Sequence, residues 1–168
     1  TPGALTSARI ANSLFGLSLL EAIPAADILA KGDVEDSDGD GVSGKPNMVR
    51  DRLTKKVRLG RFGWKAGQPS VRQQNAAAFA LDLGVSSSLF PEPSGDCTVL
   101  QKACRDAALN TSPEVSDRLL DALTTYIGNL PVPKPTGGIP SDIKAGQQLF
   151  GKAGCALCHT PSFTTSSV

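Results

Sequence analysis

The chain of 168 residues is poor in several residue types, and each shortage limits the kinds of protein it can be. It contains one histidine, one methionine, one tryptophan and one tyrosine, and aromatic residues make up only 5% of it. Any histidine ligation from within the chain must therefore use His159. The longest mainly apolar stretch is residues 14–30, and it is interrupted by Ser18, Glu21, Pro24 and Asp27. This stretch is therefore too polar to span a membrane.

Excess charge of one sign and a targeting segment are also missing. The formal net charge is +1, which argues against a nucleic-acid binder on charge alone. Thr1 opens directly on small and polar residues without the pattern of a signal peptide, so we expect a mature or truncated product. The length suits one domain, or a domain and a half.

What the sequence does contain is one specific motif near its end, Cys155-Ala156-Leu157-Cys158-His159. Two cysteines separated by two residues and followed by histidine form the attachment signature of c-type haem. The spacing lets both thiols reach the two vinyl groups of the porphyrin from one helical turn, and the next residue then offers its imidazole to the iron. The sequence therefore predicts haem c anchored by Cys155 and Cys158, with His159 as the iron ligand. The scarcity of aromatic residues fits a core that a porphyrin helps to fill.

Two other uses of this motif are weaker hypotheses. A redox-active pair of thioredoxin type is expected beside a βαβ pattern, which the chain does not show. A zinc site needs four ligands, usually in closely spaced pairs. Cys97 and Cys104 would have to complete it, but six residues separate them.

Cys97 and Cys104 form a second, separate pair. A disulfide that closes this short loop is the preferred interpretation in an oxidising compartment, and two reduced cysteines on successive helical turns are the alternative. Bacterial c-type haem is attached outside the cytoplasm, so both pairs predict a periplasmic or secreted protein.

An acidic segment begins at Asp33, and it resembles the first half of a calcium-binding loop. Its predicted ligands supply oxygens at alternate positions: Asp36, Asp38, Asp40 and the carbonyl of Val42. Position twelve is Asn47 instead of the glutamate that normally closes the site. Weak ligation by Asn47, a contribution from Glu35 or Asp33, or a solvated acidic turn without calcium all stay open.

From residue 50 to residue 72 the charge reverses. The cations of this segment are Arg50, Arg52, Lys55, Lys56, Arg58, Arg61, Lys65 and Arg72. A solvated basic face is the simplest interpretation; the functional ones are steering of an acidic redox partner and pairing with haem propionates. No recognition motif accompanies the charge, so nucleic acid is not favoured. Trp64, within the segment, fits either core packing or an electron relay.

Helical patterns dominate the chain, so we expect a mainly α fold with long loops. The pattern of residues 6–30 predicts two short helices. Ser7 is the expected N-cap of the first helix, and the break between the two lies at Ile23-Pro24. Ser70 and Gln73 form a capping box for a helix that ends at Gly84. Its expected buried stripe is Ala76, Phe79, Ala80 and Leu83.

Two further helices follow. Ser112-Pro113 opens the first, which runs to Gly128, and Ser141-Asp142 caps the second. The expected buried stripe of the first is Val115, Leu119, Leu123 and Ile127, and the second has Ile143, Gly146, Leu149 and Phe150 on one face. Between them lies a linker rich in proline and glycine. We therefore expect a helical, loop-rich domain at 1–130, a linker at 131–140 and the start of a c-type haem domain at 141–168.

Five segments together resemble the bacterial di-haem oxidoreductase family. They are Gly-Leu-x-Leu-Leu-Glu-Ala-Ile-Pro (16–24), Asp-Gly-Asp-Gly-Val-Ser-Gly (38–44), Gly-Arg-Phe-Gly-Trp-Lys-Ala (60–66), the Asp96-Cys97 to Cys104 region and the final haem motif. That family is labelled as peroxidases or thiol oxidoreductases and is similar to di-haem cytochrome c peroxidases. Its members carry two haem motifs on several hundred residues. The resemblance therefore implies cytochrome c-like domains, an internal fragment with a truncated C-terminal haem domain, and another motif upstream of Thr1.

The resemblance also implies a function, an electron-transferring c-type haem oxidoreductase of peroxidase type, with an electron-donor or acceptor protein as partner. An electron carrier without catalysis is the first alternative, and a calcium-binding interaction domain with a redox or zinc CxxC is the second. Met48 is a candidate distal haem ligand, although loop packing fits it too. An acid–base group within this chain would have to be a carboxylate such as Glu21 or Glu114.

Overall fold

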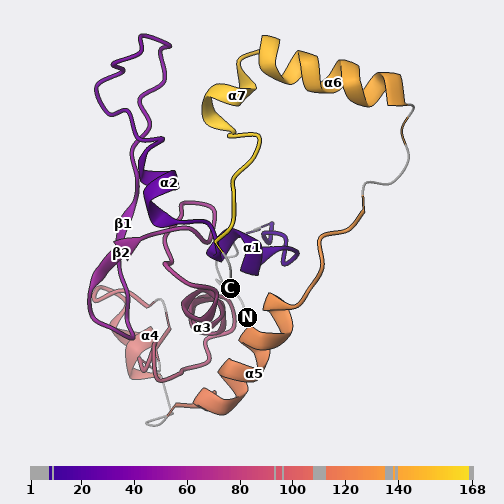
Figure 1. The fold of residues 1–168 in the computed structure, drawn as a ribbon. Helices are drawn as coiled ribbons and strands as arrows, with labels where there is room; N and C mark the ends of the chain where they lie inside the picture. The colour runs from indigo at the N-terminus through magenta and orange to yellow at the C-terminus, as the bar shows by residue number, and fades with distance from the viewer. Residues whose placement is uncertain are drawn as a thin grey trace.

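The computed structural model describes residues 8, 10–92, 94–95, 97–107, 113–134, 138 and 140–166. Within these ranges the fold is mostly helical, with seven helices and one two-stranded antiparallel hairpin (Figure 1). No helix of the described residues is long and apolar enough to cross a membrane. The mainly α fold expected from the sequence is confirmed at this level.

The elements follow one another along the chain with long loops between them. In order they are α1 (Leu17–Glu21), α2 (Ala25–Leu29), β1 (Met48–Arg50), β2 (Val57–Leu59), α3 (Val71–Asp82), α4 (Lys102–Asp106), α5 (Asp117–Gly128), α6 (Pro140–Lys152) and α7 (Cys155–Cys158). The two strands pair with Met48 opposite Leu59 and Arg50 opposite Val57.

The first helix and α5 begin later than the sequence predicts. The first helix begins only at Leu17, and its predicted cap Ser7 lies outside the described residues. The break at Ile23-Pro24 is confirmed, since α2 begins directly after Pro24. The α5 helix begins at Asp117, because the Ser116 hydroxyl caps it by accepting a hydrogen bond from the Leu119 amide; Ser112 lies outside the described residues.

The core lies where α3 packs against α5 and the segment before α5. Its main cluster is Ala76, Ala77, Ala80, Leu89, Phe90, Val115 and Leu120. A second buried cluster consists of Phe62, Val71 and Ile127. The partly buried side chains of Leu17, Leu20 and Leu123 pack against it. The α1 helix thereby rests on α3 and α5, as Figure 1 shows.

Two predicted core positions are wrong. Leu119 is 54% exposed while its neighbour Leu120 is completely buried, and Leu83 is 67% exposed at the end of α3. Positions seven apart drift by only about 20° around a helix, so Leu120 and Ile127 face the core together. Leu119 lies about 100° from Leu120 and about 80° from Ile127 around the helix, so it falls outside the narrow stripe that those two residues share.

Gln73 plays a different part from the predicted one. The Ser70 hydroxyl accepts a hydrogen bond from the Gln73 amide at 3.2 Å, so Ser70 caps α3 as expected. The Gln73 side chain, however, accepts from the Arg52 amide at 2.7 Å and donates to the Arg50 carbonyl at 3.2 Å. It ties α3 to the hairpin and does not complete the capping box.

The loop between α3 and α5 carries the second cysteine pair. Cys97 and Cys104 form a disulfide, as predicted, with their Cα atoms 6.0 Å apart. Cys104 lies within α4, whereas Cys97 lies in the loop before it. The loop between α3 and α5 is therefore closed locally by a covalent bond.

Candidate functional site

The haem motif occupies a single helical turn at the end of the α6–α7 pair. Gly154, with φ +77°, adopts the left-handed conformation and starts α7 immediately after α6. Neither helix contains a buried residue, and α6 packs mainly against α7. This pair lies at the edge of the molecule, apart from the α3–α5 core (Figure 1).

The three predicted haem-attachment residues lie within this turn. Cys155 and Cys158 are free and exposed, one at each end of α7. The His159 amide donates to the Cys155 carbonyl at 2.9 Å, and its backbone then becomes extended. The His159 ring lies 6.3 Å from the Phe150 ring, centroid to centroid, with the planes tilted by 57°. Two exposed thiols and an imidazole on one turn fit the donor set that haem c requires.

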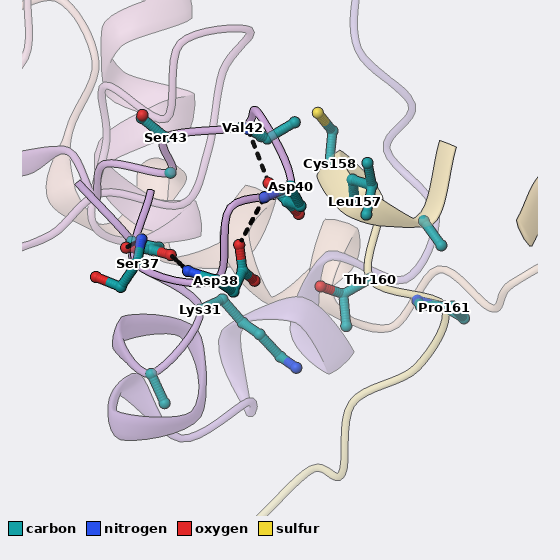
Figure 2. A pocket seen from close by; sticks show the side chains of 15 residues that line it. Lys31, Ser37, Asp38, Asp40, Val42, Ser43, Leu157, Cys158, Thr160 and Pro161 are labelled. Carbon is teal, nitrogen blue, oxygen red and sulfur yellow. Dashed lines mark hydrogen bonds between the residues drawn. The ribbon is translucent and has the colours of Figure 1, made fainter. Parts of the chain in front are cut away.

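A cleft of about 880 Å³ lies between α7 and the acidic loop, which we define as residues 33–44. Its lining residues include Leu157 and Cys158 on one side, and Asp38, Asp40 and Val42 on the other. Figure 2 shows the Cys158 sulfur on the side of α7 that faces Val42 and Asp40. The fold thus brings together two motifs that are more than a hundred residues apart in the sequence.

The segment after His159 returns to the body of the protein. Ser166 donates two hydrogen bonds to the Ala22 carbonyl, from its amide at 2.9 Å and from its hydroxyl at 2.8 Å. Figure 1 shows this segment running from α7 down to α1. These bonds restrain α7 beside the acidic loop.

The acidic loop is closed by a bridge between Asp33 and Gly44 and is held by its own carboxylates. Asp33 accepts hydrogen bonds from the amides of Ser37 and Asp38 at 2.9 and 3.3 Å. The bond from the Ser37 amide is the main cause that lowers the pKa of Asp33. Asp36 accepts from the Gly41 amide at 3.1 Å.

The carboxylates that come closest are not the set predicted for calcium. Among the described residues, oxygens of Asp33, Asp36 and Asp38 lie within 4.8 Å of one another, and Asp40 does not belong to this group. The Asp40 carboxylate instead accepts from the Val42 amide at 2.7 Å. Asn47, at position twelve, donates its side-chain amide to the carbonyls of Lys65 and Ala66 at 3.0 and 3.2 Å, and so braces a different loop.

About half of the basic segment has a structural role. Arg52 lies 3.9 Å over the Phe90 ring, and Arg72 bridges α3 to Asp117 and Asp121 of α5. Arg61 donates to three carbonyls at the end of α1, those of Leu20, Glu21 and Ile23. Four cations of the segment are exposed and engage in no described ion pair: Arg50, Lys55, Lys56 and Lys65.

Asp51 is the buried counter-charge of this segment. Burial would raise the pKa of Asp51, but hydrogen bonds from the Thr54 and Leu53 amides and from the Arg58 guanidinium outweigh it. Together they lower the pKa of Asp51 to about 2. The Arg58–Asp51 ion pair, at 3.1 Å, thus helps to hold the turn that joins β1 to β2.

The other candidate residues lie outside the cleft lining. Trp64 is 74% exposed and donates its indole N–H to the Ile10 carbonyl at 2.8 Å. Of its two interpretations, core packing is wrong, and the electron relay stays a prediction. Met48 begins β1 and is half exposed. Glu21 accepts from the Val71 amide at 3.2 Å, and Glu114 accepts from the Ser86 amide at 3.0 Å. Both glutamates therefore brace the fold.

Lys31, Thr160 and Pro161 also line the cleft, and the sequence did not single them out for any role. Lys31 lies between α2 and the acidic loop, and no motif contains it. Thr160 and Pro161 follow Cys158 closely in the sequence, whereas Lys31 comes near Cys158 only through the fold, so no local signal could have revealed Lys31.

Comparison with known proteins gives a family but no individual relative. The family model described as "Di-haem oxidoreductase, putative peroxidase" matches residues 3–168, nearly the whole chain. No curated protein and no solved structure gives a significant match. The matched range includes the haem motif and the segment at 60–66. The chain therefore belongs to the di-haem oxidoreductase family.

Proposed function

We propose that this chain binds haem c covalently through Cys155 and Cys158 and transfers electrons as part of a peroxidase-like oxidoreductase. The observation that carries the proposal is the arrangement of two free, exposed thiols and the imidazole of His159 on one turn, in a member of this family. When bound, haem supplies an iron centre that accepts and releases single electrons.

The residues around this turn hold and orient the donors. Gly154 allows the sharp entry into α7, so that Cys155 and Cys158 stand one turn apart. The bond from the His159 amide to the Cys155 carbonyl fixes where the imidazole leaves the helix. Phe150 lies beside the imidazole, with the two ring centroids 6.3 Å apart. A fixed ring orientation favours a stable bond from histidine to iron.

The proposal is tested by production in a host that matures c-type cytochromes. We expect a coloured chain that stains for haem after denaturing electrophoresis, because thioether bonds survive denaturation. The double variant Cys155→Ala/Cys158→Ala should lose the stain. The matched control Cys97→Ala/Cys104→Ala removes the same number of cysteines and should keep it. A colourless wild-type product with free thiols at 155 and 158 would disprove the proposal.

We propose a periplasmic or secreted location and a division into a body at 1–130, a linker at 131–140 and a haem segment from 141. The Cys97–Cys104 disulfide supports the location, since such bonds persist in oxidising compartments. The division is supported by α6, which packs mainly against α7 and not against α3 or α5. Fractionation of the native host and detection of the disulfide by mass spectrometry test the location.

An electron carrier without catalysis is the second candidate. It is favoured by the positions of Glu21 and Glu114, which bond backbone amides of the fold and do not line the cleft. Peroxide turnover with a ferrous donor protein separates the two functions. Turnover by the haem-loaded protein supports the peroxidase, and reducible haem without turnover supports the carrier.

Calcium binding by the acidic loop stays a prediction. Asp33, Asp36 and Asp38 bring their oxygens within 4.8 Å of one another, although several of these oxygens also accept backbone hydrogen bonds. If calcium binds, chelation should lower the thermal midpoint of unfolding, and native mass spectrometry should detect one ion per chain. An unchanged midpoint and no bound ion would identify the loop as an acidic turn.

We propose that the partner protein is acidic and meets the exposed cations of the hairpin, Arg50, Lys55 and Lys56. Charge of this kind increases the rate of association and makes that rate depend on salt. Raising the ionic strength should therefore slow reduction of the haem-loaded chain by an acidic donor. The variant Lys55→Gln/Lys56→Gln should reduce this salt dependence.

A further inference from the structure

We propose that the acidic loop forms an electrostatic wall of the haem site and lowers the reduction potential of haem attached at Cys155 and Cys158. The inference rests on the proposed haem attachment. It deepens that proposal, because it gives a tuning role to residues that lie outside the haem motif.

The geometry of the cleft is the first argument. Leu157 and Cys158 line one side, and Asp38, Asp40 and Val42 line the other. Figure 2 shows the Cys158 sulfur facing the loop. A group bonded to this sulfur would therefore stand next to the carboxylates of the loop.

The charge of the cleft is the second argument. The charged side chains that line it are Lys31, Asp33, Asp38 and Asp40. Three carboxylates face one ammonium group, which leaves an excess of two negative charges on this wall. These residues therefore make the electrostatic potential at Cys158 negative.

The rigidity of both sides is the third argument. In the loop, the Asp38 carboxylate accepts from the Asp40 amide at 3.2 Å, and the Asp40 carboxylate accepts from the Val42 amide at 2.7 Å. On the other side, the two bonds from Ser166 to Ala22 restrain the segment that follows α7. These hydrogen bonds favour one arrangement of the loop, which keeps the carboxylates of Asp38 and Asp40 on the cleft side.

Ferric haem carries one more positive charge than ferrous haem, so negative charge nearby stabilises the oxidised form. At an effective dielectric constant of about 20, a unit charge about 10 Å away changes such an equilibrium roughly tenfold. Solvent in the open cleft screens part of this effect. We therefore expect removal of one carboxylate to raise the equilibrium constant for reduction by about three- to tenfold, where tenfold corresponds to about 59 mV.

The test compares Asp38→Asn and Asp40→Asn with wild type in the full chain after haem maturation. Asparagine keeps the oxygen that accepts the loop hydrogen bond and removes only the charge. The reduction potential is measured by spectroelectrochemical titration with a chelator present, so that no divalent cation neutralises the loop. The matched control is Glu35→Gln, which removes the same charge from the same loop at a position that does not line the cleft.

We expect both aspartate variants to raise the potential and Glu35→Gln to change it by less than a third as much. Lys31→Gln, which removes the one cation of the wall, should lower it. Unchanged potentials in all variants would overturn the inference while the haem proposal stands. An equal shift with Glu35→Gln would overturn it too, because net charge alone would then explain the effect. A chain without covalent haem would remove the haem proposal and this inference with it.

Discussion

At Asp51, burial and hydrogen bonding act on one carboxyl group in opposite directions, and hydrogen bonding prevails. The group is 4% exposed, and its pKa is lowered from 3.8 to about 2. A carboxyl whose pKa is lower in the folded state stabilises the fold above its unfolded pKa, and this contribution is lost as the pH falls through its folded pKa. The shift corresponds to about 2 kcal/mol in the free energy of unfolding at neutral pH.

We therefore expect Asp51→Asn to lower the free energy of unfolding by about 2 kcal/mol at pH 7. The difference from wild type should shrink between pH 4 and pH 2, as the wild-type carboxyl becomes protonated. Urea denaturation over this pH range measures it. Glu35→Gln, at an exposed position, is the control and should change stability by less than about 0.5 kcal/mol. A deficit of equal size at pH 2 and pH 7 would contradict the assignment.

Gly60 is a second residue whose identity the fold dictates. A Cβ atom at this position would lie 1.8 Å from the Ala66 carbonyl oxygen and 3.2 Å from that of Asn47. Both neighbours are backbone atoms, so the clash cannot be relieved by rotating a side chain. The glycine lets two backbone segments approach each other at the start of the loop that holds Arg61 and Trp64.

We expect Gly60→Ala to destabilise the protein by about 3 kcal/mol or more. Gly67→Ala is the matched control, because its Cβ would meet no atom within 4 Å. This second change should be neutral or stabilise by up to about 1 kcal/mol, since alanine restricts the unfolded chain. Thermal unfolding of both variants gives the comparison, and equal losses would show that the close approach at Gly60 is wrong.

At the scale of single elements, a shift of one position along α5 decides which of two adjacent leucines lies in the core. Leu120 is completely buried in the main cluster, whereas Leu119 is 54% exposed. Leu120→Ala should lower the free energy of unfolding by about 2–5 kcal/mol, because it removes packed methyl groups and leaves a cavity. Leu119→Ala should cost less than about 1 kcal/mol. Chemical denaturation of the two variants would give the reverse order if the stripe predicted from the sequence were correct.

The same helices show how far local sequence signals reach. The break at Ile23-Pro24, the cap at Ser70 and the helix end near Gly84 were predictable, because proline, serine and glycine act on their own neighbours. The phase of α5 was not, since it depends on contacts with α3. Gln73 was misassigned for a similar reason, because its partners Arg50 and Arg52 lie on the hairpin.

The site divides in the same way between local and distant signals. Cys155, Cys158 and His159 stand together in one pentapeptide, so their spacing alone predicts a haem site. The cleft opposite Cys158 depends on the return of Ser166 to Ala22, which no pattern in the sequence indicates. The regrouping of the acidic loop around Asp33 likewise follows from the fold of that loop.

At the scale of the whole molecule, the stability of the chain is unevenly distributed. The buried residues belong to α3, α5 and the segments packed on them, and neither α6 nor α7 contributes one. Segments with few buried contacts open at a lower free energy than the core. The α6–α7 pair should therefore unfold separately from the body of the protein.

Hydrogen exchange tests the separate unfolding of α6 and α7 in a chain that is produced without haem maturation. We expect amides of 140–158 to exchange at least a hundredfold faster than those of α3. Attachment of haem should slow exchange in 140–158 and leave α3 unchanged, because only the first segment carries the predicted attachment site. Protection of α6 equal to that of α3 before maturation would contradict the unequal distribution.

The separation of the two cysteine pairs has a consequence for oxidative folding. Only six residues lie between Cys97 and Cys104, so their thiols meet far more often than either meets a thiol of α7. Mispairing between distant cysteines is therefore disfavoured from the start of oxidation. Cys155 and Cys158 must then be kept reduced for thioether formation. A simple reductant can do this without a disulfide isomerase, because the two cysteines form one local pair.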